Sequence, residues 1–153
     1  MNIFLNRTFI KGEYAHGHLT IDGLCVCDTL ENSRSCVPKG DYVIRLVRCK
    51  QYARKMPCLN PHCGPGPHAG LDPASLCDLC PKLPFVCNNS TLPCWCPMLK
   101  PGNAVHNRLD GSILVGQYHC LNCLIHPKSV FDALYERIRK SISRGNQVIL
   151  CVQ

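Results

Sequence analysis

Long apolar runs are missing from this sequence, and their absence limits where the protein can reside. No stretch of about eighteen apolar residues occurs, so the sequence offers no candidate for a transmembrane helix. The first residues, MNIFLNRTFIKGEY, are interrupted by Asn6, Arg7 and Lys11. They lack the continuous apolar segment and the small-residue cleavage site of a signal peptide. We therefore expect a protein of the cytoplasm or of a virion.

Aromatic and acidic residues are also scarce. Aromatic residues make up 7% of the chain, and 10 acidic residues against 17 Lys and Arg give a net charge of +7. Much of this charge falls in two basic clusters, which are Arg45, Arg48, Lys50, Arg54 and Lys55, and Arg137, Arg139, Lys140 and Arg144. Nucleic-acid modules combine such clusters with stacking aromatics, but Trp95 lies elsewhere, between two cysteines. Nucleic-acid binding is therefore not favoured.

Two other interpretations of the positive charge remain. Solvated basic faces that keep the protein soluble are the simpler one. An anionic partner, such as a cell-wall polymer, is the alternative. The oligomeric state stays open, and a homo-oligomer is compatible with the sequence.

The N-terminal third has the pattern of a β-meander. Short apolar and β-branched segments alternate with turn dipeptides such as Lys11-Gly12 and Asp22-Gly23. The predicted strands are Asn2–Ile10, Tyr14–Ile21, Leu24–Leu30 and Tyr42–Val47. A chain of 153 residues is long enough to bury a core of its own, so we predict a single domain that spans residues 1–153.

The C-terminal third predicts a strand, a helix and another strand. Ile113–Val115 is a short apolar segment closed by Gly116. Ser129 is a suitable N-cap for a helix that stops at Gly145. Its apolar stripe consists of Phe131, Leu134, Tyr135, Ile138 and Ile142. Gln147–Val152 follows as a final buried strand.

These elements define the predicted fold class. It is α+β: a mainly antiparallel β-sheet or meander, one C-terminal amphipathic helix, a final strand, and an irregular cysteine-rich insertion. The insertion follows from the fourteen cysteines, seven of which lie in a segment rich in Pro and Gly that has no periodicity able to bury a core. Because a long structureless segment is improbable inside a compact domain, we predict that residues 57–98 form an insertion held by cross-links or metal.

Two Cys-x-x-Cys pairs have the spacing of a zinc knuckle, in which one tight turn directs two thiolates at a tetrahedral ion. The pairs are Cys77 with Cys80, and Cys120 with Cys123. Other sulfur and imidazole groups are alternate ligands, namely Cys58, His62, Cys63, His119 and His126. A reducing compartment would keep these thiols free. Structural zinc is therefore the predicted cofactor, with disulfides or an iron–sulfur cluster as alternatives.

Four short motifs follow one another in a defined order. They are Asp28–Glu31, Val37–Tyr42, Gly102–Asn103 and Gly111–Gly116. In order and spacing they resemble a small domain family of unknown function from bacteriophages and Bacteroides-type bacteria, over most of the chain except residues 57–98. They are also similar, more distantly, to the L,D-transpeptidase fold. That similarity implies a catalytic cysteine at the position of Ser112 and a catalytic histidine at the position of Lys100, so both positions are changed.

Two functional hypotheses follow. The first is a non-enzymatic structural or binding module of phage origin whose cysteine-rich insert is held by zinc, because both matched positions are substituted while cysteines accumulate elsewhere. The second is a peptidoglycan-active enzyme related to L,D-transpeptidases with Ser112 as an altered nucleophile. A serine hydroxyl needs stronger activation than a thiol, and His106, oriented by Asp110, is the candidate base in this second hypothesis.

Overall fold

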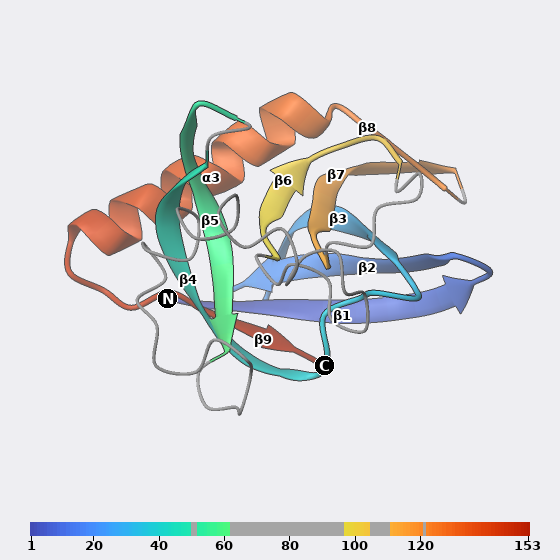
Figure 1. Cartoon of the computed structure of the whole chain (residues 1–153), viewed down its shortest axis with the longest axis horizontal. Coiled ribbons are helices and arrows are strands. Elements are labelled where there is room, and N and C mark those ends of the chain that lie inside the picture. The colour runs from blue at the N-terminus through green and yellow to red at the C-terminus, as the bar shows by residue number, and fades with distance from the viewer. Residues whose placement is uncertain (50–51, 62–96, 105–110, 121) are drawn as a thin grey trace, which may run out of the picture.

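The computed structural model describes residues 1–49, 52–61, 97–104, 111–120 and 122–153. The described residues form nine strands and one helix (Figure 1). In chain order these are β1 (Asn2–Lys11), β2 (Tyr14–Ile21), β3 (Leu24–Asn32), β4 (Gly40–Cys49), β5 (Arg54–Pro61), β6 (Leu99–Pro101), β7 (Ile113–Cys120), β8 (Cys123–Ile125), α3 (Pro127–Ser143) and β9 (Ile149–Val152).

The strands form one mixed sheet that bends into a nearly closed barrel. Their order is β5-β4-β9-β1-β2-β3-β7-β6, and β8 pairs with β7 outside this path. The two ends of the order approach each other, because Cys58 in β5 forms a bridge with Met98, just before β6. The Leu59 amide also donates a hydrogen bond to the Pro97 carbonyl over 2.8 Å. This contact covers backbone groups that an open sheet edge would expose, and α3 lies across one side of the barrel (Figure 1).

The predicted meander is present, but it is only part of the sheet. β1, β2 and β3 pair antiparallel. Asp22 and Gly23 close the second hairpin with φ angles of 53° and 78°, as a type I′ turn requires. The final strand β9 lies inside the sheet, parallel to β1 and antiparallel to β4, and β6 pairs parallel with β7. The sheet is therefore mixed, which the strand pattern alone did not indicate.

Strands β1, β3, β4 and β9 differ from their predicted bounds by one or two residues at an end, and two other segments differ more. Strand β5 extends through residues 57–61, so regular structure enters the segment predicted as an insertion. Strand β7 continues to Cys120, and the prediction that Gly116 closes it is wrong. A Cβ atom at Gly116 would lie 2.8 Å from the Cβ of Leu124 in β8. The glycine is therefore needed for close packing of the two strands, and not for ending one of them.

Helix α3 begins at Pro127, and the prediction that Ser129 is its N-cap is wrong. The N-cap is His126, in the left-handed region with φ 51°. The Ser129 hydroxyl, inside the first turn, donates a hydrogen bond to the His126 carbonyl over 3.1 Å. Proline suits the first helical position because it has a preset φ and no amide hydrogen to satisfy. The predicted stop at Gly145 is confirmed by its φ of 78° and by the hydrogen bond that its amide donates to the Ile142 carbonyl over 2.9 Å.

The predicted apolar stripe of α3 faces the main core. Phe131, Leu134 and Ile138 are buried, and Tyr135 and Ile142 are partly buried against the same cluster. Burying a side chain of this size stabilises the fold by about 1.5–3 kcal/mol. Arg54 from the start of β5 covers the stripe, with its guanidinium 4.4 Å from the centre of the Tyr135 ring. The helix is thus held by apolar burial and by a cation–π contact.

One ion pair is buried inside the fold. Glu31, of which 1% of the side chain is exposed, accepts hydrogen bonds of 2.9 and 3.0 Å from the Arg7 guanidinium. Arg7 also donates to the Val37 carbonyl, and the Val37 amide donates to Glu31. Burial opposes the charge on Arg7, but its hydrogen bonds and attraction to Glu31 outweigh this effect and raise the pKa of Arg7. The pair therefore fixes the segment before β4 to both β1 and β3.

We expect Glu31→Gln to lower the free energy of unfolding by about 3 kcal/mol, because it leaves the buried guanidinium without a counter-charge. Urea unfolding followed by circular dichroism measures the loss. Glu13→Gln is the matched control, since it breaks the exposed ion pair with Arg34, which we expect to contribute at most about 1 kcal/mol. Equal losses in the two variants would contradict a structural role of the buried pair.

Candidate functional site

Ser112 and Lys100, the positions onto which the resemblance carries a nucleophile and a base, lie on the same face of the sheet. Lys100 in β6 is the register partner of Leu114 in β7, and Ser112 precedes Leu114 by two residues. Side chains alternate along a strand, so Lys100 and Leu114 share one face, and continuing the alternation to the residue just before β7 places Ser112 on that face as well. From strand spacing and rise, the Cα atoms of Lys100 and Ser112 lie roughly 8 Å apart. The lysine is 2% exposed and the serine 6% exposed.

The same face carries two further buried polar residues that the sequence analysis did not single out. His16 in β2 is the register partner of Leu30 in β3, and Leu30 is the partner of Leu114. Asn32 follows Leu30 by two residues and therefore lies on this face as well. We call His16, Asn32, Lys100 and Ser112 the polar face. The mixture of polar and apolar residues on β2 and β3 was the sequence signal for these buried polar residues. The pattern of a single strand does not show which residues of four neighbouring strands share a face.

His16 joins the polar face to two exposed aromatic rings. Its ring stacks on Phe9 with centroids 4.5 Å apart and meets the edge of Tyr118 at 5.5 Å. Phe9 is 39% exposed and Tyr118 is 47% exposed, whereas His16 is 2% exposed. The imidazole is thus enclosed between rings. His16, Lys100 and Ser112 are all engaged in contacts, so none of them is an isolated polar group, as burial requires.

The motif residues around the polar face have structural partners. Asp28 accepts a hydrogen bond of 2.8 Å from the Tyr118 amide and so ties β3 to the bulged end of β7. The Asn103 side chain donates to the Leu124 carbonyl, and its own carbonyl accepts from the Leu124 amide, which holds β8 against the turn after β6. Two of the four motifs therefore have residues with a structural role in hydrogen bonding. The presence of these motifs is therefore not by itself evidence of a catalytic activity.

The chemistry available at Ser112 depends on residues that are only partly described. A serine nucleophile needs a base within hydrogen-bond reach and donors for the oxyanion. His106 and Asp110, the predicted base and its partner, lie outside the described residues. Among the described residues, the basic groups on this face are Lys100, on the strand next to β7, and His16, two strands from β7. The arrangement brings together the two positions that the resemblance matched, but it does not establish a nucleophile–base pair.

Cys120 and Cys123 face each other across the β7–β8 hairpin. They are direct register partners in this antiparallel pair, so one short turn holds both thiols on neighbouring strands. Cys120 is exposed and Cys123 is half-buried, and both are free thiols. Their nearest polar contacts are weak ones to the Asn122 side chain and the Leu124 carbonyl, at 3.9 and 3.6 Å. Two soft ligands placed in this way fit half of a tetrahedral zinc site.

The other predicted metal ligands are distributed differently. His119 occupies the register irregularity between Tyr118 and Cys120 and is exposed. His126 caps α3, and Cys58 is buried in β5 at the closure of the barrel. The remaining predicted ligands, Cys77, Cys80, His62 and Cys63, lie outside the described residues. Within the described ranges, no three His, Cys, Asp or Glu side chains come together to hold a metal ion.

Several other cysteines have environments that suppress reactivity. Burial raises the pKa of the Cys27 thiol to about 12, and the neighbouring Cys25 and Asp28 add to the effect. Burial also raises the pKa of Cys151 to about 11, assisted by a hydrogen bond to Asp41. Cys49 is buried, while Cys25 is exposed. The buried thiols of Cys27 and Cys49 act as small apolar side chains.

Comparisons of the chain with protein-family models, with curated proteins and with solved structures found no match. The resemblance to the phage family and to L,D-transpeptidases therefore stays a prediction. Within the described part of the chain, no helix is long and apolar enough to cross a membrane.

We expect iodoacetamide at pH 8 to alkylate Cys25 much faster than Cys27, two residues away on the same strand. With a pKa of about 12, only about one Cys27 thiol in ten thousand is ionised at pH 8, and the thiolate is the reacting form. Peptide mapping by mass spectrometry after timed labelling measures both rates. In urea the two rates should become similar, whereas similar rates in the folded protein would show that Cys27 is accessible and ionised.

Proposed function

We propose that this protein is a non-enzymatic structural or binding module of phage origin, in which zinc holds the cysteine-rich segment to the barrel. The observation that carries the proposal is the register pairing of Cys120 with Cys123. Both thiols lie on the β7–β8 hairpin, with Cys120 exposed and Cys123 half-buried, and neither has a strong competing partner among the described residues. A tetrahedral structural site needs four ligands. Cys77 and Cys80 are the ligands that the sequence predicts to complete it.

The chemistry of the site supports zinc in preference to a catalytic metal. Structural zinc sites are closed by four Cys or His ligands, whereas catalytic sites keep one position open for water. Two Cys-x-x-Cys pairs supply four thiolates and leave no open position. Bound zinc would connect the segment after β5 to the β7–β8 hairpin. This connection would stabilise a segment whose sequence has no apolar periodicity long enough to bury a core of its own.

We expect protein purified without chelator or reductant to contain about one zinc ion for each set of four thiolate ligands. Elemental analysis together with a count of titratable thiols measures this. Cys120→Ser and Cys123→Ser should each lower the zinc content, because each removes a ligand. Cys25→Ser is the matched control, since Cys25 is exposed on β3 and belongs to neither pair, and it should leave the zinc content unchanged.

Two results would contradict the zinc proposal. Protein without metal and with few titratable thiols would show that the cysteines form disulfides, and hence that the protein resides in an oxidising location. Iron together with acid-labile sulfide would indicate an iron–sulfur cluster and a role in electron transfer.

The polar face favours a second candidate, a peptidoglycan-active enzyme with Ser112 as its nucleophile. The supporting observation is that Ser112 and Lys100 share one buried face, although they stand apart in the sequence. His106 and Asp110 remain the proposed base and orienting group. We rank this candidate second, because the face is enclosed and its neighbouring motif residues already have structural partners.

We expect Ser112→Ala to fold normally and to give the same muropeptide profile as the native protein when each is incubated with peptidoglycan. Chromatography of the digested polymer measures both cleavage and cross-linking. Ser141→Ala, which removes a buried hydroxyl from α3, controls for loss of stability. If Ser112→Ala abolished an activity that Ser141→Ala retained, the enzymatic candidate would replace the first.

A further inference from the structure

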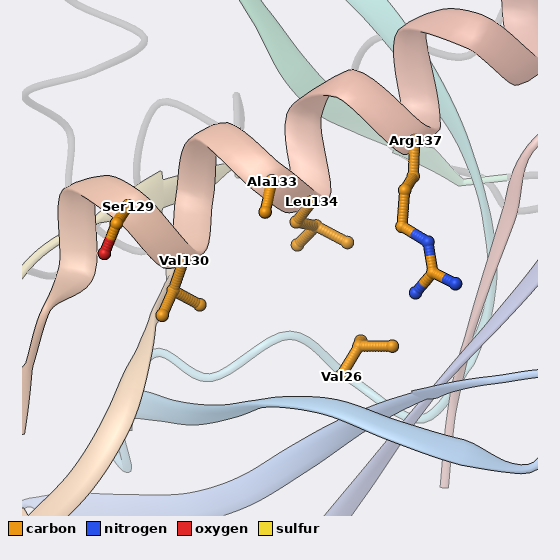
Figure 2. A pocket seen from close by; sticks show the side chains of 6 residues that line it. All are labelled: Val26, Ser129, Val130, Ala133, Leu134 and Arg137. Carbon is orange, nitrogen blue, oxygen red and sulfur yellow. The ribbon is translucent and has the colours of Figure 1, made fainter.

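A hollow lies between one flank of α3 and strand β3 (Figure 2). Its volume is about 260 Å³, and its lining consists of Val26, Ser129, Val130, Ala133, Leu134 and Arg137. It is independent of the polar face and of the predicted zinc ligands, because none of these six residues belongs to either. Ligand pockets for drug-sized molecules measure about 300–1,000 Å³. The hollow therefore suits a smaller molecule.

The shape of the hollow follows from the strand and the helix. Val26 falls at a register irregularity of β3, where Cys25 pairs with Thr20 but Cys27 pairs with Leu19. The flank of α3 presents the small side chain of Ala133 opposite this point, with Leu134 as a buried wall. Ser129 and Arg137 lie eight residues apart, which is about 12 Å along a helix. The hollow is thus an elongated apolar space with a polar residue at either end.

Arg137 gives one end of the hollow a positive charge. Figure 2 shows its side chain descending from the helix toward the side where Val26 lies. Within the described residues Arg137 forms no ion pair, because the two acidic residues of α3 are engaged elsewhere. Asp132 binds Lys128 and Arg54, and Glu136 accepts hydrogen bonds from Arg139 through both carboxylate oxygens.

The end of the hollow at Ser129 offers no second binding group for an anion. The Ser129 hydroxyl donates its hydrogen to the His126 carbonyl, so it is not available to donate to a ligand. None of the described residues that line the hollow carries a carboxylate. A guanidinium binds a carboxylate through two parallel hydrogen bonds, and the remaining lining is apolar. The charge and the shape together select a molecule with one anionic end and an apolar tail.

We propose that this hollow binds a small monocarboxylate with an unbranched apolar tail. The carboxylate pairs with Arg137, and the tail lies along Ala133 and Val130 against Val26. This site does not depend on zinc or on Ser112. It gives the protein a binding activity for amphipathic acids that is separate from its proposed role as a zinc-held module.

The test is a titration of the ¹⁵N-labelled full chain with sodium octanoate, followed by amide NMR. We expect saturable shifts at Val26 and along residues 129–137. Arg137→Gln should weaken binding about tenfold or more, as expected for loss of a charge-assisted pair. Lys140→Gln removes an equal charge from the same helix without touching the hollow, so its affinity should stay within about twofold of the native value.

Tail length and charge are tested with two other probes. Butanoate should bind more weakly by about fourfold for each methylene removed, and octan-1-ol should bind more weakly than octanoate because it lacks the anion. Ala133→Met should fill the space and weaken octanoate binding while Arg137 is retained. The proposal is overturned if octanoate gives no saturable shift at these residues, if Arg137→Gln binds it as tightly as the native chain, or if octan-1-ol binds equally well.

Discussion

The buried ion pair of Arg7 and Glu31 is the constraint on which the order of the barrel depends. Two opposite charges removed from water must stay together, since either one alone would be strongly destabilising. Their hydrogen bonds reach β1, β3 and the backbone of Val37. The Tyr42 hydroxyl adds a bond of 2.9 Å to the Pro38 carbonyl. The chain is therefore fixed as it passes from the meander into β4, which pairs with β9 inside the sheet.

The two faces of the sheet serve different purposes. One face and α3 enclose the main apolar core. The other carries a small cluster of Leu30, Leu114 and Leu124, beside the four residues of the polar face. Buried polar groups of this kind restrict the arrangements that a fold can adopt, because each needs its partners. The four residues of the polar face can therefore contribute to the structural specificity of the fold.

Cysteine has at least three roles in this chain. Cys27 and Cys49 are buried apolar groups, Cys58 lies at the closure of the barrel, and Cys120 with Cys123 forms an accessible pair. The differences follow from environment, because burial raises the pKa of the Cys27 thiol, whereas the hairpin places Cys120 and Cys123 where their sulfur atoms can reach a metal ion. A total of fourteen cysteines therefore does not indicate one chemistry. The proposed zinc site concerns only the cysteines that remain accessible or lie in the cysteine-rich segment.

The sequence by itself determined those strands, turns and helix bounds whose backbone conformation depends on residues that are close together in the chain. Tyr14–Ile21 has the predicted bounds, and Asp22-Gly23 forms the predicted turn, since its φ angles depend on those two residues alone. The tertiary structure decided what depends on distant partners. These features are the parallel pairing of β9 with β1, the packing of Leu124 that Gly116 permits, and the placement of Lys100 and His16 on one face of the sheet. Strand pairing is set by contacts between segments far apart in sequence, and a periodic pattern shows that a residue is buried without showing what it is buried against.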